Sequence, residues 1–315
     1  MKRLKIIKNR SDIGAGTRGS DLGIDALEIA AINAGNDFFH RYPYMDIPTH
    51  NETIYDKVNN SFAKRINFVA EQCERLAEAV NMVVHQGYFP LILSGDHSSA
   101  AGSIAGLKKA YPDLRLGVIW IDAHADLHSP YTTPSGNVHG MPLAAALGFD
   151  YADKAVRRLD ASTHEGWQSV VQMAGKVPAV APEDLIYFGL RSTEVHENSV
   201  IDDHGIRFYR VAETRHRGLL TCLDEALDQL QDVDHVYITF DVDSLDCDLV
   251  SRGTGTPVEK GFDPQEVQTI IAHFMQHKKV AALEVCEINP LLDEKGNRMA
   301  ETAFGILQSL FSSTD

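Results

Sequence analysis

The sequence lacks the cysteine spacing of a zinc ribbon or a disulfide framework. Its four cysteines, Cys73, Cys222, Cys247 and Cys286, are scattered over 315 residues and form no CxxC pair, which indicates reduced thiols. The sequence also has no apolar segment of signal-peptide length at its amino terminus and no apolar run long enough to span a membrane. These absences predict a cytoplasmic protein that does not enter a membrane.

The chain also lacks an excess of basic residues. It carries 29 Lys and Arg against 44 Asp and Glu, which is a formal net charge of −15. A protein that binds nucleic acid needs a basic face for the phosphates, so this balance argues against a nucleic-acid partner. Carboxylates gathered around bound cations would cancel part of this charge, because the formal count includes side chains alone.

Short apolar runs alternate with helical patterns along the chain. The runs that predict strands cover residues 4–7, 89–93, 116–121, 185–190, 206–209, 235–240 and 280–285. Helical spacing of apolar residues predicts helices near residues 24–34, 62–85, 98–111, 219–230, 264–277 and 302–311. A polar segment that contains proline, residues 40–53, predicts a surface loop.

This alternation predicts an α/β fold with three layers. Strands that alternate with helices form a mostly parallel sheet, and helices then cover both of its faces. No linker, repeat or low-complexity tract interrupts the pattern. We therefore expect a single domain over residues 1–315.

One predicted strand is followed at once by three potential metal ligands. Asp122, His124 and Asp126 stand at alternate positions after the apolar run 118–121. In an extended chain, side chains two residues apart point to the same side, so these three could converge on one cation. Taken alone, such a set is about equally compatible with a purely structural role, because Asp and His also cap helices and satisfy turns.

Other predicted strands lead to side chains of the same kinds. One strand precedes His97, another precedes Asp241 and Asp243, and a third contains Glu284 and precedes Glu287. Ligands of open α/β sheets bind beyond the carboxyl ends of the strands. The joint occurrence at several strand ends favours a metal site over separate caps and turns.

The number and type of these ligands suit two divalent cations. Two imidazoles and four carboxylates are available: His97, Asp122, His124, Asp126, Asp241 and Asp243. Four negative charges match two such cations, because one would leave buried carboxylates repelling each other. Oxygen-rich ligands with imidazole and no thiolate favour manganese over structural zinc. Two cations about 3.5–4 Å apart can activate a shared water, which predicts a hydrolase.

The motifs that contain these residues resemble the ureohydrolase family, most closely its arginase branch. They span most of the chain in the family's order: GDHS (95–98), DAHAD (122–126), SGNVHG (135–140), FDVDSLD (240–246), GTGTPV (253–258) and EINP (287–290). The resemblance implies a hydrolase with two Mn²⁺ per subunit that converts L-arginine and water to L-ornithine and urea. A metal-bridging hydroxide would attack the guanidinium carbon. It also implies a homo-oligomer, either a trimer or a hexamer.

The resemblance assigns a role to each matching residue. One manganese would bind His97, Asp122, Asp126 and Asp241, and the other would bind Asp122, His124, Asp241 and Asp243. Asp126 would also orient the hydroxide and move its proton, and His139 would act as proton shuttle. Glu287 would pair with the guanidinium, with Glu284 as the competing candidate. The remaining matches concern the substrate: Thr256 near the guanidinium, and Ser135 and Asn137 at the α-carboxylate.

Two residues depart from the arginase pattern at the amino-acid end of the substrate. His128 stands where arginases commonly have Asn, and Glu194 stands where a shorter Asp is expected to bind the α-amino group. The nearest alternatives are therefore an agmatinase and a guanidinobutyrase-like enzyme. A formimidoylglutamase is less favoured because Ala125 stands where that branch carries a bulky aromatic. A non-catalytic metal-binding protein is disfavoured because no expected ligand is missing and His139 is present.

Overall fold

The computed structural model of the protein describes residues 3–58, 60–155 and 158–311. In this part of the chain, eight parallel strands form one sheet in the order β2-β1-β3-β8-β7-β4-β5-β6. The strands are β1 (Leu4–Asn9), β2 (Tyr44–Asp46), β3 (Phe89–Ser94), β4 (Leu116–Ile121), β5 (Leu185–Phe188), β6 (Arg207–Tyr209), β7 (His235–Asp241) and β8 (Val280–Cys286). The predicted parallel sheet is confirmed.

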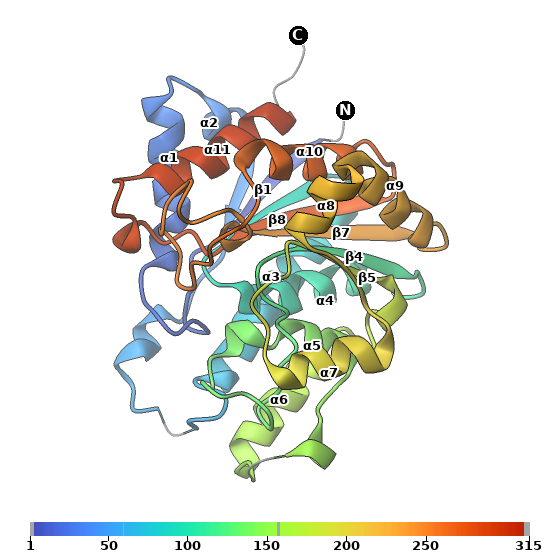
Figure 1. Cartoon of the computed structure of the whole chain (residues 1–315). Coiled ribbons are helices and arrows are strands. Elements are labelled where there is room, and N and C mark those ends of the chain that lie inside the picture. Colours follow the sequence, from blue (N-terminus) through green and yellow to red (C-terminus); the bar gives the residue numbers. More distant parts are fainter. Residues whose placement is uncertain (1–2, 59, 156–157, 312–315) are drawn as a thin grey trace.

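Helices cover both faces of the sheet, as predicted (Figure 1). One layer contains α1 (Gly23–Asn33), α2 (Phe38–Arg41), α8 (Val211–Arg217), α9 (Leu219–Gln229), α10 (Pro264–Met275) and α11 (Arg298–Phe311). The opposite layer contains α3 (Ile66–His85), α4 (Ala100–Ala110), α5 (Pro142–Leu147), α6 (Ala161–Gln172) and α7 (Val195–His204). Within the described ranges, none of these helices combines the length and the apolar character needed to cross a membrane.

The central strands read as continuous apolar runs because both of their faces are buried. Every residue of β4 is buried. Ile119 and Ile121 belong to one hydrophobic cluster, whereas Val118 and Trp120 belong to the cluster on the other face. Successive strand side chains point to opposite faces, so one short strand contributes to both halves of the core. This burial anchors the strand end from which Asp122 follows.

The prediction of a loop over residues 40–53 is wrong in part. Residues 44–46 form β2, which pairs with β1 at the edge of the sheet. None of its side chains is buried, so this edge strand has no apolar signal. The apolar pattern also did not reveal α6, α7 and α8. In α7 only Glu197, Val200 and Ile201 are buried, which is too few to produce a helical stripe.

Glu284 has a structural position away from the pocket described below. Its carboxylate accepts hydrogen bonds from Ser99 (2.7 Å), from Ser103 and from the hydroxyl of Tyr237 (2.7 Å). All four side chains are buried. The network joins β8 to β7 and to the start of α4, and it satisfies a buried carboxylate. Of the two competing glutamates, Glu284 therefore belongs to the scaffold.

Replacing Tyr237 with Phe should destabilise the fold, because the Glu284 carboxylate loses a buried donor. Hydrogen bonds to charged groups contribute roughly 1.5–3 kcal/mol, so we expect the free energy of unfolding to fall by about that amount. Urea denaturation measures the change. Tyr88→Phe is the matched control, because its hydroxyl accepts a solvent-exposed hydrogen bond from Arg3. Equal stability of the two variants would contradict the role of this network.

Candidate metal centre

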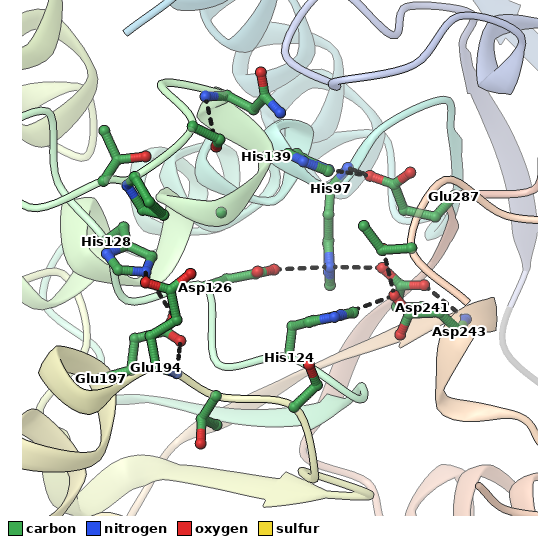
Figure 2. A pocket seen from close by; sticks show the side chains of 18 residues that line it. His97, His124, Asp126, His128, His139, Glu194, Glu197, Asp241, Asp243 and Glu287 are labelled. Carbon is green, nitrogen blue, oxygen red and sulfur yellow. Dashed lines mark hydrogen bonds and ion pairs between the residues drawn. The ribbon is translucent and has the colours of Figure 1, made fainter. Parts of the chain in front are cut away.

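The predicted site residues gather at one edge of the sheet. β3, β8, β7 and β4 are neighbours in the strand order and run in the same direction, so their carboxyl ends meet. A pocket opens there (Figure 2) and is lined by every predicted site residue except Asp122. The lining residues among them are His97, His124, Asp126, His128, Ser135, Asn137, His139, Glu194, Asp241, Asp243, Thr256 and Glu287. Asp122 is fully buried.

His97 is the centre of the first group of ligands. Its Nδ1 atom lies 3.0 Å from Asp122 Oδ2 and 3.2 Å from the Oδ2 atoms of both Asp126 and Asp241. Nε2 contacts the Thr239 hydroxyl at 2.9 Å, and Trp120 stacks on the imidazole at a centroid distance of 4.1 Å. Nδ1 is buried and has no hydrogen-bond partner among the described residues. An imidazole nitrogen without a partner that faces three carboxylates is in the arrangement that a cation would complete.

The second group shares Asp122 with the first. His124 Nδ1 lies 2.9 Å from Asp243 Oδ2 and 3.6 Å from Asp122 Oδ1. The two oxygens of Asp122 therefore face one imidazole each, as the predicted bridging role requires. Asp241 directs Oδ2 toward His97, while its Oδ1 accepts a hydrogen bond from the Asp243 backbone at 2.8 Å. That Asp241, like Asp122, would bridge the two cations stays a prediction.

Asp122, His124 and Asp126 do not form one ligand group, and the chain that carries them is not extended. Asp126 belongs to the group of His97, His124 belongs to the group of Asp243, and Asp122 belongs to both. β4 ends at Ile121 and the following backbone bends, with Asp126 in the left-handed region at φ 53°. Asp122 Oδ1 holds the bend by accepting a hydrogen bond from the His124 backbone at 2.7 Å. A left-handed backbone costs a non-glycine residue about 1–2 kcal/mol, and such residues cluster at functional sites.

The electrostatics of the buried carboxylates fit divalent cations. Burial and the neighbouring charge of Asp122 raise the pKa of Asp126 to about 7. Burial and neighbouring carboxylates likewise raise the pKa values of Asp241 and Asp243. Burial also acts on Asp122, but its close contacts with the imidazoles of His124 and His97 outweigh burial and lower its pKa. Without cations, protons must therefore relieve the repulsion among these carboxylates.

Glu287 and His139 form a pair beside the ligand groups. Glu287 Oε1 accepts a hydrogen bond from the His97 backbone at 2.9 Å and lies 3.0 Å from His139 Nδ1. Burial opposes the charge on both groups, but their contact dominates: it raises the pKa of His139 to about 9 and lowers the pKa of Glu287. Only 17% of the His139 side chain is accessible, so the imidazole is partly shielded from solvent.

The second carboxylate oxygen of Glu287 has no hydrogen-bond partner in the described part of the chain. Oε2 is buried without a hydrogen bond, and the residue has φ 66°, again in the left-handed region. The carboxylate lines the pocket. A buried carboxylate oxygen without a donor is costly, so its position indicates a ligand that supplies one.

His128 and Glu194, the two residues that depart from the arginase pattern, lie against each other on the outer wall of the pocket (Figure 2). His128 Nε2 lies 3.4 Å from Glu194 Oε2 and 3.8 Å from Glu197 Oε1. Glu197 is buried and accepts hydrogen bonds from the backbones of Leu127 (3.2 Å) and Glu194 (3.0 Å). It therefore fixes the start of α7 against the loop that carries His128. Burial lowers the pKa of His128.

Ser135 and Asn137 lie in the loop on another side of the pocket. The Asn137 backbone donates to the Ser135 hydroxyl at 3.2 Å, and Lys64 donates to the Asn137 side chain at 2.8 Å. Gly136 between them has φ 73°, and a Cβ atom there would lie 1.9 Å from the Ser61 carbonyl oxygen. The loop thus needs glycine to present its two polar neighbours to the pocket.

Several residues of the centre were not predicted from the sequence. Thr239 supports His97 and stands two residues before Asp241 on β7, so strand alternation could have placed it on the same face. Glu197 follows Glu194 by three residues, which is the spacing of a capping box. Cys286 pairs with Asp241 in the strand register, and this pairing could be known only from the sheet order. A thiol therefore lies near the predicted ligands, although none of the predicted ligands is a cysteine.

Comparisons with known proteins agree with the fold and the site. The sequence matches the Arginase family over residues 3–312. It is 35% identical over 314 residues to an arginase from Bacillus caldovelox, covering 99% of this chain and 98% of that protein. It is also 35% identical over 311 residues to an arginase from Bacillus subtilis (strain 168), covering 98% and 97%. A native structure of the Bacillus caldovelox arginase has a TM-score of 0.84 at 35% identity and covers 100% of this chain and 99% of that chain.

The sheet, the two helix layers and the carboxylate–imidazole centre define an α/β enzyme of the metal-dependent hydrolase class that acts on C–N bonds. The chain belongs to the arginase family. The family and fold predicted from the motifs are confirmed.

Binding of a divalent cation should release protons near neutral pH. Burial lowers the pKa values of His97 and His124, but the surrounding acidic groups raise both well above the usual value, so these imidazoles carry protons in the metal-free protein. A cation must displace them, and its affinity should therefore weaken as pH falls from about 8 to about 6. Calorimetry with manganese in buffers of different ionisation enthalpy measures the released protons. A buffer-independent heat would contradict this description.

Proposed function

We propose that the protein hydrolyses L-arginine to L-ornithine and urea, with two manganese ions per subunit. The observation that carries this proposal is one pocket with two ligand groups that share Asp122, beside the unpartnered Oε2 of Glu287. The first feature suits hydrolysis, and the second suits a substrate with planar N–H donors. The relatives named arginase support arginine as that substrate.

Each manganese would be held by four side chains. One would bind His97, Asp122, Asp126 and Asp241, and the other would bind Asp122, His124, Asp241 and Asp243. Carboxylates with one imidazole per cation favour manganese over softer metals. When bound, two cations lower the pKa of water enough to supply hydroxide near neutral pH.

Glu287 would bind the guanidinium of the substrate. Its Oε2 is free to accept an N–H donor, while Oε1 keeps its contacts with His97 and His139. The substrate can therefore enter without breaking the pair that positions His139. Thr256 donates to Asp243 at 3.0 Å in the same part of the pocket, close to the place where the guanidinium would lie.

Asp126 and His139 would move the protons of the reaction. Asp126 would orient the attacking oxygen through its carboxylate and accept a proton from it. His139 holds a proton at neutral pH, because its contact with Glu287 raises its pKa to about 9 against the effect of burial. It can donate that proton toward the leaving amine and regain one from solvent, since its side chain is partly accessible.

The outer wall would bind the amino-acid end of the substrate. Glu194 would accept from the α-ammonium, whereas Ser135 and Asn137 would donate to the α-carboxylate. Lys64, which contacts Asn137, adds positive charge on that side. His128 Nε2 contacts the Glu194 carboxylate and so leaves it less free to bind an α-ammonium group. This contact favours a second candidate, a guanidino acid without an α-amino group, because such a substrate makes no demand on Glu194.

Three further predictions from the sequence continue as proposals. We propose one domain over residues 1–315, because the described strands all belong to one sheet. The cytoplasmic location and the homo-oligomer, a trimer or a hexamer, stay predictions.

A substrate panel tests the proposed reaction. With the manganese-loaded protein, kcat/KM for urea release should be about 10- to 100-fold higher for L-arginine than for agmatine, because agmatine lacks the α-carboxylate and its charge-assisted hydrogen bonds. The panel includes guanidinobutyrate and formimidoylglutamate, and His128→Asn is assayed in parallel. A higher kcat/KM for agmatine or guanidinobutyrate than for L-arginine would identify that compound, and not arginine, as the substrate. No turnover of any of these compounds would favour a non-catalytic metal-binding protein.

Asp126→Asn should abolish measurable turnover, with kcat lowered at least about 10²- to 10⁴-fold, because an amide cannot accept the proton. Manganese content, measured on the same sample, separates loss of a ligand from loss of proton transfer. Asp113→Asn is the matched control, since Asp113 is an exposed acid in the loop before β4. Near-normal turnover of Asp126→Asn would contradict its dual role.

A further inference from the structure

Cys286 lies directly behind the first group of ligands. It is the last residue of β8 and pairs with Asp241, the last residue of β7, in the strand register. Its side chain is fully buried. Because backbone pairing fixes both residues, the thiol is held beside the Asp241 carboxylate by the sheet itself.

The thiol is close to the atoms that face the cation position. Cys286 Sγ lies 4.0 Å from Asp241 Oδ2, which is the same oxygen that lies 3.2 Å from His97 Nδ1. A ligand atom of each of these three residues lies within 4.8 Å of the other two. The thiol also approaches the Phe240 carbonyl oxygen at 3.9 Å. Its weak polar contacts leave the sulfur available to a ligand.

His97 provides an independent indication that a cation belongs at this position. Only 1% of its side chain is exposed, and its Nδ1 has no hydrogen-bond partner. Its other nitrogen contacts the Thr239 hydroxyl. With a cation bound, Nε2 would donate to that hydroxyl and the lone pair of Nδ1 would face the cation, as in metal-binding histidines.

The spacing is compatible with coordination by sulfur. In a tetrahedral site with a metal–sulfur distance of about 2.3 Å and a metal–oxygen distance of about 2.0 Å, the sulfur and oxygen atoms are about 3.5 Å apart. The observed 4.0 Å separation between Cys286 Sγ and Asp241 Oδ2 exceeds this by about half an ångström. A small rotation of the cysteine side chain would close that gap.

We infer that Cys286 is a further ligand at this centre and that it binds a thiophilic divalent cation such as zinc, cadmium or cobalt(II) together with His97 and Asp241. The inference rests on the metal centre of the proposed function but not on its substrate. Binding converts the thiol to a thiolate and releases its proton to solvent. At the other cation position, His124 and Asp243 form no ligand group with a described cysteine. Soft cations would therefore bind at the position beside His97.

Spectroscopy of the cobalt(II)-loaded protein tests this inference. We expect a near-ultraviolet sulfur-to-cobalt charge-transfer band in the native protein, and loss of that band in Cys286→Ser. Cys247→Ser is the matched control: Cys247 is also buried, but it lies in the loop after β7 and belongs to no ligand group. This variant should keep the band. A band that persists in Cys286→Ser would overturn the inference.

A second measurement needs no variant and so does not depend on how Cys286→Ser folds. X-ray absorption of the native protein loaded with one zinc per chain should show a sulfur shell at about 2.3 Å. A shell of nitrogen and oxygen alone would overturn the inference. Urea release by the manganese-loaded protein is assayed separately, so failure of the proposed reaction and failure of the thiol ligand give different results.

Discussion

The repulsion among four buried carboxylates is the constraint on which the site depends. Asp122, Asp126, Asp241 and Asp243 come from two neighbouring strand ends and lie beneath or within one pocket. Their charges cannot remain close together in a buried position without cations or protons. Protonated imidazoles can neutralise part of the charge, and divalent cations can neutralise all of it. The fold therefore places together carboxylates whose charges cations or protons must neutralise, and two groups of these side chains have the spacing to hold a cation.

The sheet supplies the precision that this centre needs. The parallel order places the ends of four strands at one edge, and burial on both faces holds them there. Around the ligands, Trp120 and Thr239 fix the ring of His97, and Glu287 fixes both its backbone and the ring of His139. The outer wall comes from loops and from the start of α7. The proposed metal ligands thus lie at or just after strand ends, whereas the residues proposed for the amino-acid end of the substrate lie in loops and at the start of α7.

The same division explains how far the site could be predicted. The metal ligands follow apolar runs that are easily read as buried strands, so their convergence at one edge followed from the rule for parallel sheets. The contact of His128 with Glu194 and the contact of His139 with Glu287 did not follow, because both depend on loop conformations. The edge strand β2 was missed for a related reason: its exposed residues have no apolar period.

The sequence by itself determined the family, the alternation of strands and helices, and the residue types of the centre, because these properties are carried by local patterns and ordered motifs. Only the tertiary structure decided which side chains are partners. The left-handed backbone of Asp126, the unpartnered oxygen of Glu287 and the position of Cys286 beside Asp241 are examples. Each depends on how segments distant in the chain pack together, and a local pattern contains no information about strand order or loop geometry.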